Sequence, residues 1–384
     1  MAIHFNRTVP GLWIGGGFTG TGFAIVYLQK AGSRGENAMK PFAKMALAAL
    51  LLAPVPALAQ QTEAEVGVPP AAPADWQAPR TPWGDPDLRG TYPLESMGST
   101  PMQRPARFGS RKLLNDEEYA QSLDAARELA GLADVEDEAG VLGSGNWFER
   151  GVPLRQTSLI VEPADGRVPP LTPAGEALRA QMRDSWNNEV FEGPQDFNSL
   201  DRCLSRGLPA TMIPFPYNNG LRVFQAPGVV VINLEMIHET RVIHLGEAAP
   251  PPGTLRTYLG HSRGHWEGNT LVVETTHFNG LSPMVIVGPS NRPIPTSEQL
   301  QVTEHFTMTG PGQVYYEAWI TDPVVLTDGF KMAFPWTRDD EYQPFEYACH
   351  EGNTIVPAYV RATSPRFADW RVANGGTREP APVN

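Results

Sequence analysis

Residues 221–245 read LRVFQAPGVVVINLEMIHETRVIHL, and this stretch decides the fold class. Its β-branched and aromatic residues fall in short runs interrupted by Gly, Pro and polar residues, which is typical of strands joined by turns. No helix-length segment separates the runs, so we expect an antiparallel meander that closes as a lipocalin-like β-barrel, with a β-sandwich as the alternative. The same pattern continues in HWEGNTLVVETTHF (265–278), LQVTEHFTM (300–308), QVYYEAWIT (313–321) and FKMAFPWTR (330–338).

The chain before residue 200 has a different character, because its apolar residues recur at helical spacing. Two surface helices are predicted, from Asn115 to about Gly131 and from Pro173 to Asn187, with Asn115 and Thr172 as N-caps. The sequence predicts that the chain has four parts: an upstream extension plus signal peptide (1–59), a disordered leader (60–82), helical and irregular decoration (83–200) and the β-barrel (201–384). We expect the last two parts to form one domain.

Residues 39–59 have the three parts of a secretory signal peptide. A basic region is followed by the apolar run 45–55 and by an A-x-A cleavage site that ends at Ala59. The apolar run is too short and too broken by prolines to span a bilayer stably. The signal peptide Met39–Ala59 therefore predicts a periplasmic or secreted protein, with a membrane anchor at residues 11–28 as the alternative.

Charge and cysteine content limit the partners. The formal net charge is −12 and no basic run is present, so we expect no nucleic-acid partner, and no membrane partner after signal cleavage. An exported chain with two cysteines favours a disulfide between Cys203 and Cys349, with two free buried thiols as the alternative. The oligomeric state stays open.

Standard cofactor and catalytic motifs are missing from the sequence. It contains no C-x-x-C, H-E-x-x-H, G-x-S-x-G, Walker or Rossmann motif. His261 and His265 would lie on one face of a strand, but too far apart for a metal pair. We expect neither a metal nor an organic cofactor.

Three carboxylates alternate with apolar residues and are therefore expected on apolar strand faces: Glu235, Glu274 and Glu304. A buried carboxylate is costly unless it is paired or protonated, and this cost is typical of a general acid or base in an apolar pocket. The alternative is a one-residue error in register, which would place these side chains in water.

A second candidate region is the loop DRCLSRGLPATMIPFPYNNG, residues 201–220. Arginine, tyrosine and asparagine suit the binding of a carboxylate or an oxyanion, and this loop offers Arg202, Arg206, Tyr217 and Asn218. The alternative is a simple turn at 218–220 with Arg202 in a surface ion pair. If Cys203 pairs with Cys349, the third region, YACHEGN (347–353), brings His350 and Glu351 beside Arg202 and Arg206.

At these residues the chain resembles a family of exported bacterial proteins. Its blocks are TPWGDPDLRGTY, DRCLSRGLP, PYNN, VVINLEMIHETRVIHL, SRGHWEGNTLVVETTHF and YACHEGN. The chain departs from the family at GTY, where a tryptophan is usual, and at TEHF, where an arginine usually precedes the phenylalanine. Most members have no assigned activity. The chain is also similar to cofactor-free decarboxylases of lignin-derived aromatic acids, and this likeness implies a lyase.

These features predict a cofactor-independent decarboxylase for an aromatic, hydroxycinnamate-like acid. Such an acid loses carbon dioxide once its side chain is protonated, because a quinone methide absorbs the charge. Alternatives are a non-catalytic binder of aromatic or lipid-like molecules and a hydrolase with a water activated by His and Glu. We expect the substrate carboxylate to be oriented by Arg202, Arg206 and Asn218, and the proton to come from Glu235, Glu304 or His265. The phenol would contact Tyr217 and His238, and further substrate contacts would come from His350 and Glu351. The walls of the aromatic slot would be Trp266, Phe306 and Trp319.

Overall fold

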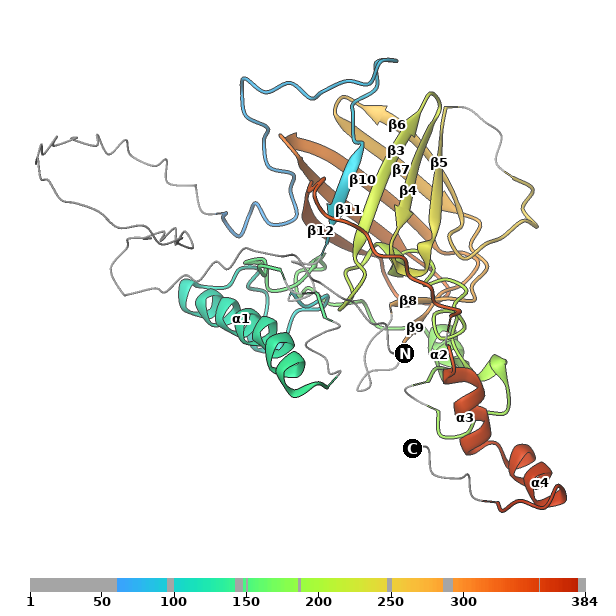
Figure 1. Cartoon of the computed structure of the whole chain (residues 1–384). Coiled ribbons are helices and arrows are strands. Elements are labelled where there is room, and N and C mark those ends of the chain that lie inside the picture. The colour runs from blue at the N-terminus through green and yellow to red at the C-terminus, as the bar shows by residue number, and fades with distance from the viewer. Residues whose placement is uncertain are drawn as a thin grey trace, which may run out of the picture. The chain divides into compact units, whose positions relative to one another are not determined.

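A sheet of ten strands dominates the computed structural model and curls into a half-barrel (Figure 1). The structure describes residues 61–94, 100–141, 148–149, 151–185, 188–246, 251–285, 293–351 and 353–378. The signal peptide and the upstream extension lie outside these residues. The strand order is β1-β3-β4-β5-β6-β7-β10-β11-β12-β2. A mainly β fold of the barrel type is therefore confirmed.

The strands of the large sheet are short and follow the predicted runs closely. Their bounds are β1 (Gly90–Pro93), β2 (Ile160–Glu162), β3 (Gly220–Ala226), β4 (Val229–Leu234), β5 (Thr240–Leu245), β6 (His261–Glu267), β7 (Thr270–Thr276), β10 (Gln301–Gly310), β11 (Gln313–Thr321) and β12 (Phe330–Thr337). A separate two-stranded sheet contains β8 (Pro283–Val285) and β9 (Ile294–Pro295).

The expectation of a wholly antiparallel sheet is wrong at one pair of strands. β5 and β6 run parallel, with Ile243 opposite Ser262 and His244 opposite Arg263. Parallel neighbours need a crossover of about a dozen residues or more, and the connection 246–260 is long enough. The described residues of this connection, 246 and 251–260, form no helix. The lack of a predicted helix therefore did not exclude a parallel pair.

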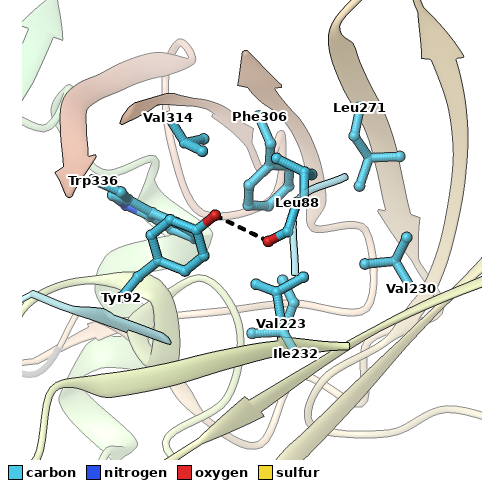
Figure 2. A pocket seen from close by; sticks show the side chains of 9 residues that line it. All are labelled: Leu88, Tyr92, Val223, Val230, Ile232, Leu271, Phe306, Val314 and Trp336. Atoms are coloured by element: carbon cyan, nitrogen blue, oxygen red, sulfur yellow. Dashed lines mark hydrogen bonds between the residues drawn. The ribbon is translucent and has the colours of Figure 1, made fainter. Parts of the chain in front are cut away.

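Side chains fill the inside of the half-barrel. Phe306, Tyr316 and Trp336 pack with ring centroids 5.0–5.4 Å apart, and each is at most 2 % exposed. The cavity that remains among them measures about 10 Å³, room for about one water molecule. Figure 2 shows its apolar lining: Leu88, Tyr92, Val223, Val230, Ile232, Leu271, Phe306, Val314 and Trp336. The barrel interior is therefore a packed core with no room for an aromatic acid.

Two helices lie in the region where helices were expected. α1 (Asp116–Ala139) begins at Asn115, whose side chain accepts from the Glu118 N–H in a capping box. It runs past Gly131 and ends at Gly140, whose left-handed conformation (φ 66°) closes the helix. α2 (Pro173–Gln181) begins at its predicted cap, Thr172, but its helical residues stop earlier than expected. Asn187 lies outside the described residues.

The remaining helices were not expected from the sequence. α3 (Ile355–Thr363) and α4 (Pro365–Ala373) follow the sheet in a region assigned to the barrel. Single 3-10 turns occur at η2 (Ala106–Phe108), η4 (Pro194–Asp196), η5 (Ala210–Met212) and η6 (Met236–His238). Among the described residues, no helix is long and apolar enough to cross a membrane.

The segment 61–68 differs from the disordered leader expected there. Val66 is 3 % exposed and packs with Val161 and Tyr315 of the sheet. The Gly67 N–H donates to the Tyr315 hydroxyl, and the Gly67 carbonyl accepts from the Lys331 ammonium over 2.7 Å. The amino-acid composition of this segment predicts disorder, but composition contains no information on hydrogen bonds to strands far away in the sequence.

Candidate functional site

The predicted disulfide between Cys203 and Cys349 is present, with 5.6 Å between the two Cα atoms. It joins the loop before β3 to residues 338–351, which we call the strap. The strap follows β12 and runs past the ends of β3, β4 and β5 toward α3 (Figure 1). Two further contacts fasten it to the turn between β4 and β5: the Tyr342 hydroxyl donates to Glu235, and His238 Nδ1 lies 2.9 Å from the Tyr347 carbonyl oxygen.

Glu235 lies under the strap and is 4 % exposed. Its carboxylate accepts from the Asn218 side-chain amide over 2.6 Å and from the Tyr342 hydroxyl over 2.7 Å. A Cβ on Gly220 would lie 2.4 Å from a Glu235 oxygen, so the carboxyl group occupies space that a glycine leaves free.

The predicted reason for the burial of Glu235 is wrong. It was expected on the strand face of Val229, Val231 and Asn233, but those side chains are half-exposed on the outer face. β4 ends at Leu234, and the chain then turns at Glu235 (φ −64°, ψ −46°). This turn, rather than strand alternation, directs the carboxyl inward.

Glu149 is the residue of this region that sequence reasoning missed. Its carboxylate accepts from the N–H groups of Asn218 (2.6 Å) and Asn219 (3.1 Å) and from the Asn219 side-chain amide (2.9 Å). Burial raises the pKa of the Glu149 carboxyl, the negative charge of Glu235 adds to the rise, and the hydrogen bonds oppose it. No periodic pattern or motif surrounds Glu149, so the sequence offers no signal for it.

Arg206 lines the same cavity as Glu235 and is 4 % exposed. Its guanidinium lies 4.6 Å from the centroid of the Phe215 ring and donates to the Ile213 carbonyl oxygen over 3.3 Å. Within the part of the chain that the structure describes, its Nε has no hydrogen-bond partner, although a buried, unpaired donor is costly. Burial lowers the pKa of Arg206 to about 10, which still leaves the guanidinium charged at neutral pH.

Two tyrosines lie near Arg206. The rings of Tyr217 and Tyr347 are parallel within 3°, their centroids are 6.5 Å apart, and their hydroxyls share a hydrogen bond. Burial raises the pKa of both phenols, so both are protonated at neutral pH. The sequence predicts Arg206 and Tyr217 as site residues, whereas it predicts no role for Tyr347.

Arg206, Asn218 and Glu235 line one small cavity of about 10 Å³. That volume holds about one water molecule, so the cavity has no room for an aromatic ring in this conformation. The backbone around the cavity is strained, because four of the five described non-glycine residues with positive φ lie here: Cys203, Asn218, Ile237 and His238. Such conformations cluster at functional sites, and this region is therefore our candidate site.

Glu304 is buried as predicted, but it lies inside the half-barrel and belongs to another cluster. It is 0 % exposed and forms a two-pronged ion pair with Arg241, whose Nη1 lies 2.8 Å from one carboxylate oxygen. The Tyr316 hydroxyl donates to the same carboxylate over 2.8 Å. Arg241 also donates to Ser262 and Thr275. Arg241 compensates the negative charge of Glu304, and the described partners of Glu304 lie within the sheet rather than in the strap.

The outer face of the sheet carries other residues predicted for the site. His265 contacts Glu267 at 3.0 Å, and their side chains are 58 % and 66 % exposed. Trp319 packs against His305 and under the Lys331 ammonium, and Glu274 is exposed. The expected burial of Glu274 is therefore wrong, because Leu271, Val273 and Thr275 take the inner face of β7.

The other predicted wall residues lie inside the half-barrel. Trp266 packs against the main core, and Phe306 belongs to the aromatic cluster near Trp336. The register of the strands thus divides the predicted slot residues between two faces of one sheet.

The disulfide does not bring His350 and Glu351 into contact with the loop arginines. Both side chains are exposed, and among the described residues neither forms a hydrogen bond or ion pair with Arg202 or Arg206. Arg202 is half-buried and its Nε donates to the Asn198 carbonyl oxygen over 3.4 Å.

Histidines do meet on the outer face, at His244, His261 and His277, with ring centroids 5.4 and 6.2 Å apart. Burial, with the neighbouring imidazoles and Arg263, lowers the pKa of His261. Within the described part of the chain, no group of three or more His, Cys, Asp or Glu side chains is arranged to hold a metal ion.

The candidate site combines a buried cation, amide donors and a carboxyl group around one hollow, and two phenol groups lie near the cation. Such a set can bind a carboxylate and exchange a proton with the molecule that carries it. No family model, curated protein or solved structure matches this chain.

Proposed function

We propose that the protein is a cofactor-independent decarboxylase of an aromatic, hydroxycinnamate-like or lignin-derived carboxylic acid, and that the strap covers its catalytic site. One observation carries the proposal: the unpartnered Nε of the buried Arg206, on a cavity that Glu235 also lines. A buried, charged donor without an acceptor, in a small cavity that also presents amide groups, suits an anionic ligand. The similarity of the sequence blocks to cofactor-free decarboxylases points in the same direction.

Arg206 and Asn218 bind the substrate carboxylate in this proposal. The guanidinium is fully desolvated, and charge-assisted hydrogen bonds are strongest where water is excluded. Phe215 holds the guanidinium plane from one side and leaves Nε free to donate. Tyr217, with its partner Tyr347, contacts the phenol end of the acid, and His238 lies on the same side at the strap.

Glu235 delivers the proton. The substrate phenol passes its proton to Nε2 of His238, whose Nδ1 faces the Tyr347 carbonyl oxygen. The side-chain carbon next to the carboxylate takes a proton from Glu235, and a quinone methide forms. The bond to the carboxylate then breaks and carbon dioxide leaves, and the bond electrons restore the aromatic ring as a phenolate. Return of the phenol proton yields the vinyl phenol, and solvent reprotonates Glu235, so protons and electrons balance.

The strap must move before an aromatic ring can reach Arg206, because the cavity holds about one water molecule. The strap, residues 338–351, has neither helix nor strand. Backbone hydrogen bonds tie its start to Thr91 and Gly312, and the contacts described at the site are the disulfide and those of Tyr342 and Tyr347. Closure of such a segment over the substrate would exclude water during the proton transfer.

Glu304, His265, Trp266, Phe306 and Trp319 have no role in this proposal. Glu304 is neutralised by Arg241, and Phe306 and Trp266 belong to the packed core. His265 and Trp319 lie on the outer face of the sheet.

Incubation of the purified protein with a panel of hydroxycinnamates tests the proposal. We expect release of carbon dioxide and a vinyl phenol for at least one acid, and a loss of turnover of at least 100-fold in Glu235→Gln. Glu267→Gln is the matched control, because Glu267 is an exposed carboxylate on the outer face. No turnover of any acid would reject the proposal.

A non-catalytic binder of aromatic or lipid-like molecules is the second candidate. One observation favours it: Glu235 already accepts two short hydrogen bonds, an arrangement that also serves a fixed, ionised carboxylate. In a binder, Glu235→Gln leaves the affinity for the acid nearly unchanged and no product forms. A hydrolase is less well supported, because His238 directs Nδ1 to the Tyr347 carbonyl rather than to Glu235.

We also propose that the protein acts in the periplasm or outside the cell. The disulfide supports this, because such bonds persist in oxidising compartments. A small aromatic acid is the expected partner, and the acidic chain is a poor match for nucleic acid.

A further inference from the structure

We infer that Glu149 is a positioning residue of this site: it holds Asn218 in the conformation that places the Glu235 carboxyl. The inference rests on the proposed function, because it assigns Glu149 a part in that reaction without contact to the substrate. Asn218 links the two carboxylates directly. Its backbone N–H donates to Glu149 over 2.6 Å, and its side-chain amide donates to Glu235 over 2.6 Å.

Asn218 needs such support because its backbone is left-handed, with φ 54°. An L-residue rarely adopts this conformation unless surrounding interactions impose it. Glu149 provides those interactions by accepting from the N–H groups of both Asn218 and Asn219. A shift of Asn218 toward ordinary φ values would carry its amide away from Glu235.

The described hydrogen bonds of Glu149 reach one loop. Its N–H donates to the Pro216 carbonyl oxygen over 2.7 Å, and its carboxylate accepts from Asn218 and Asn219. All hydrogen bonds of Glu149 that the structure describes therefore reach residues 216–219, which are about 70 positions away in the chain.

Hydrogen bonds within residues 215–219 also hold this loop in place. Asn219 accepts from the Phe215 N–H over 2.6 Å, while its amide donates to Glu149. Phe215 in turn packs under the Arg206 guanidinium. Glu149 thus supports the carboxylate-binding wall and the acid wall of the cavity at once.

The test compares Glu149→Gln with Glu63→Gln. Glu63 is a matched control, because its carboxylate also accepts from two consecutive backbone N–H groups, those of Lys112 and Leu113, and the site does not include it. We expect Glu149→Gln to lower kcat for the best hydroxycinnamate at least tenfold, with a smaller change in KM. Glu63→Gln should keep kcat within twofold, and Glu149→Asp should recover part of the loss.

Hydrogen exchange of the backbone amides gives a readout besides turnover. In Glu149→Gln the amides of Asn218 and Asn219 should exchange at least tenfold faster, and in Glu63→Gln they should not change. An equal loss of kcat in both variants, or unchanged exchange at both amides in Glu149→Gln, would overturn the inference. If the wild-type protein turns over no acid, the decarboxylase proposal fails, while faster exchange confined to Glu149→Gln still supports the positioning of Asn218.

Discussion

The side-chain amide of Asn218 donates to the carboxylate of Glu235 over 2.6 Å, across the open end of a β-hairpin. Asn218 precedes β3 and Glu235 follows β4, and the two strands pair from Leu221 opposite Leu234 onward. The Glu235 N–H continues the ladder by donating to the Gly220 carbonyl oxygen over 2.8 Å. The hairpin register thus brings the loop that we propose to bind the substrate carboxylate next to the candidate acid.

Replacement of Asn218 by glycine should separate side-chain chemistry from backbone strain. Glycine adopts the left-handed conformation without penalty, so Asn218→Gly deletes the amide and keeps the turn. We expect kcat to fall at least tenfold, with a stability loss of about 1 kcal/mol or less. Asn218→Ala should cost about 1–2 kcal/mol more, because alanine is strained at this φ.

Enzyme kinetics and urea unfolding of the two variants measure these effects. Asn233→Ala is the control, since Asn233 lies on the outer face of β4 and its amide bonds only Thr240 and the Glu239 carbonyl. Equal stability of the glycine and alanine variants would contradict the role assigned to the backbone.

Loss of the disulfide should weaken both the fold and the site. The bond spans 146 positions of sequence, and such a long loop gains about 3–5 kcal/mol from cross-linking. Cys203→Ser with Cys349→Ser should lower the free energy of unfolding by that order. It should also lower activity at temperatures where the protein remains folded, because the strap loses its covalent attachment.

Reduction of the wild-type protein is the companion measurement, since no free cysteine is found in the described residues. Thermal unfolding with and without reductant should show the same shift as the double variant. A double variant with full activity and unchanged melting temperature would show that the strap is held without the bond.

The ion pair of Arg241 and Glu304 should contribute to stability and leave the chemistry unaffected. Removal of one partner strands a buried charge, so Arg241→Met should destabilise the fold by about 3–5 kcal/mol. Arg241→Met combined with Glu304→Leu should recover most of this loss, because two apolar side chains need no partners.

A double-mutant cycle measured by urea unfolding checks this prediction. The folded double variant should keep kcat within a few-fold of the wild-type value. A kcat that collapses in the well-folded double variant would instead place Glu304 in the reaction.

Tyr92 should make the fold sensitive to alkali. Burial raises the pKa of its phenol to about 12, whereas the unfolded chain loses the proton near pH 10. Between these values the folded state binds a proton that the unfolded state has released, so stability falls as pH rises. The full effect is about 2–3 kcal/mol and is absent below pH 10.

Urea unfolding at pH 9, 10 and 11 compares the wild-type protein with Tyr92→Phe. The variant should lose stability less steeply with pH, although it lacks the hydrogen bond to the Leu88 carbonyl. The variant still contains Tyr315, whose pKa burial also raises to about 12, so a residual slope is expected. Identical slopes in the two proteins would contradict the assignment to Tyr92.

Short-range chemistry is what the sequence by itself determined. The caps at Asn115 and Thr172 set the starts of α1 and α2, because capping depends on neighbours a few residues away. Alternation within single strands placed Glu304 on the apolar side of β10. The pairing of Cys203 with Cys349 followed from the presence of only two cysteines in a chain that we expect to be exported.

Tertiary structure alone decided which of these residues meet. Arg241 lies opposite Glu304 only because β5, β6, β7 and β10 align in one register, and no local pattern encodes that alignment. Glu149 reaches Asn218 from about 70 positions away through backbone contacts that depend on the folded loop. The pairing of β6 with β7 left His265 on the outer face, while the turn after β4 directed Glu235 toward Tyr342 of the strap. Residue types and local geometry are properties of a few neighbouring residues, whereas a site depends on the packing of the whole chain.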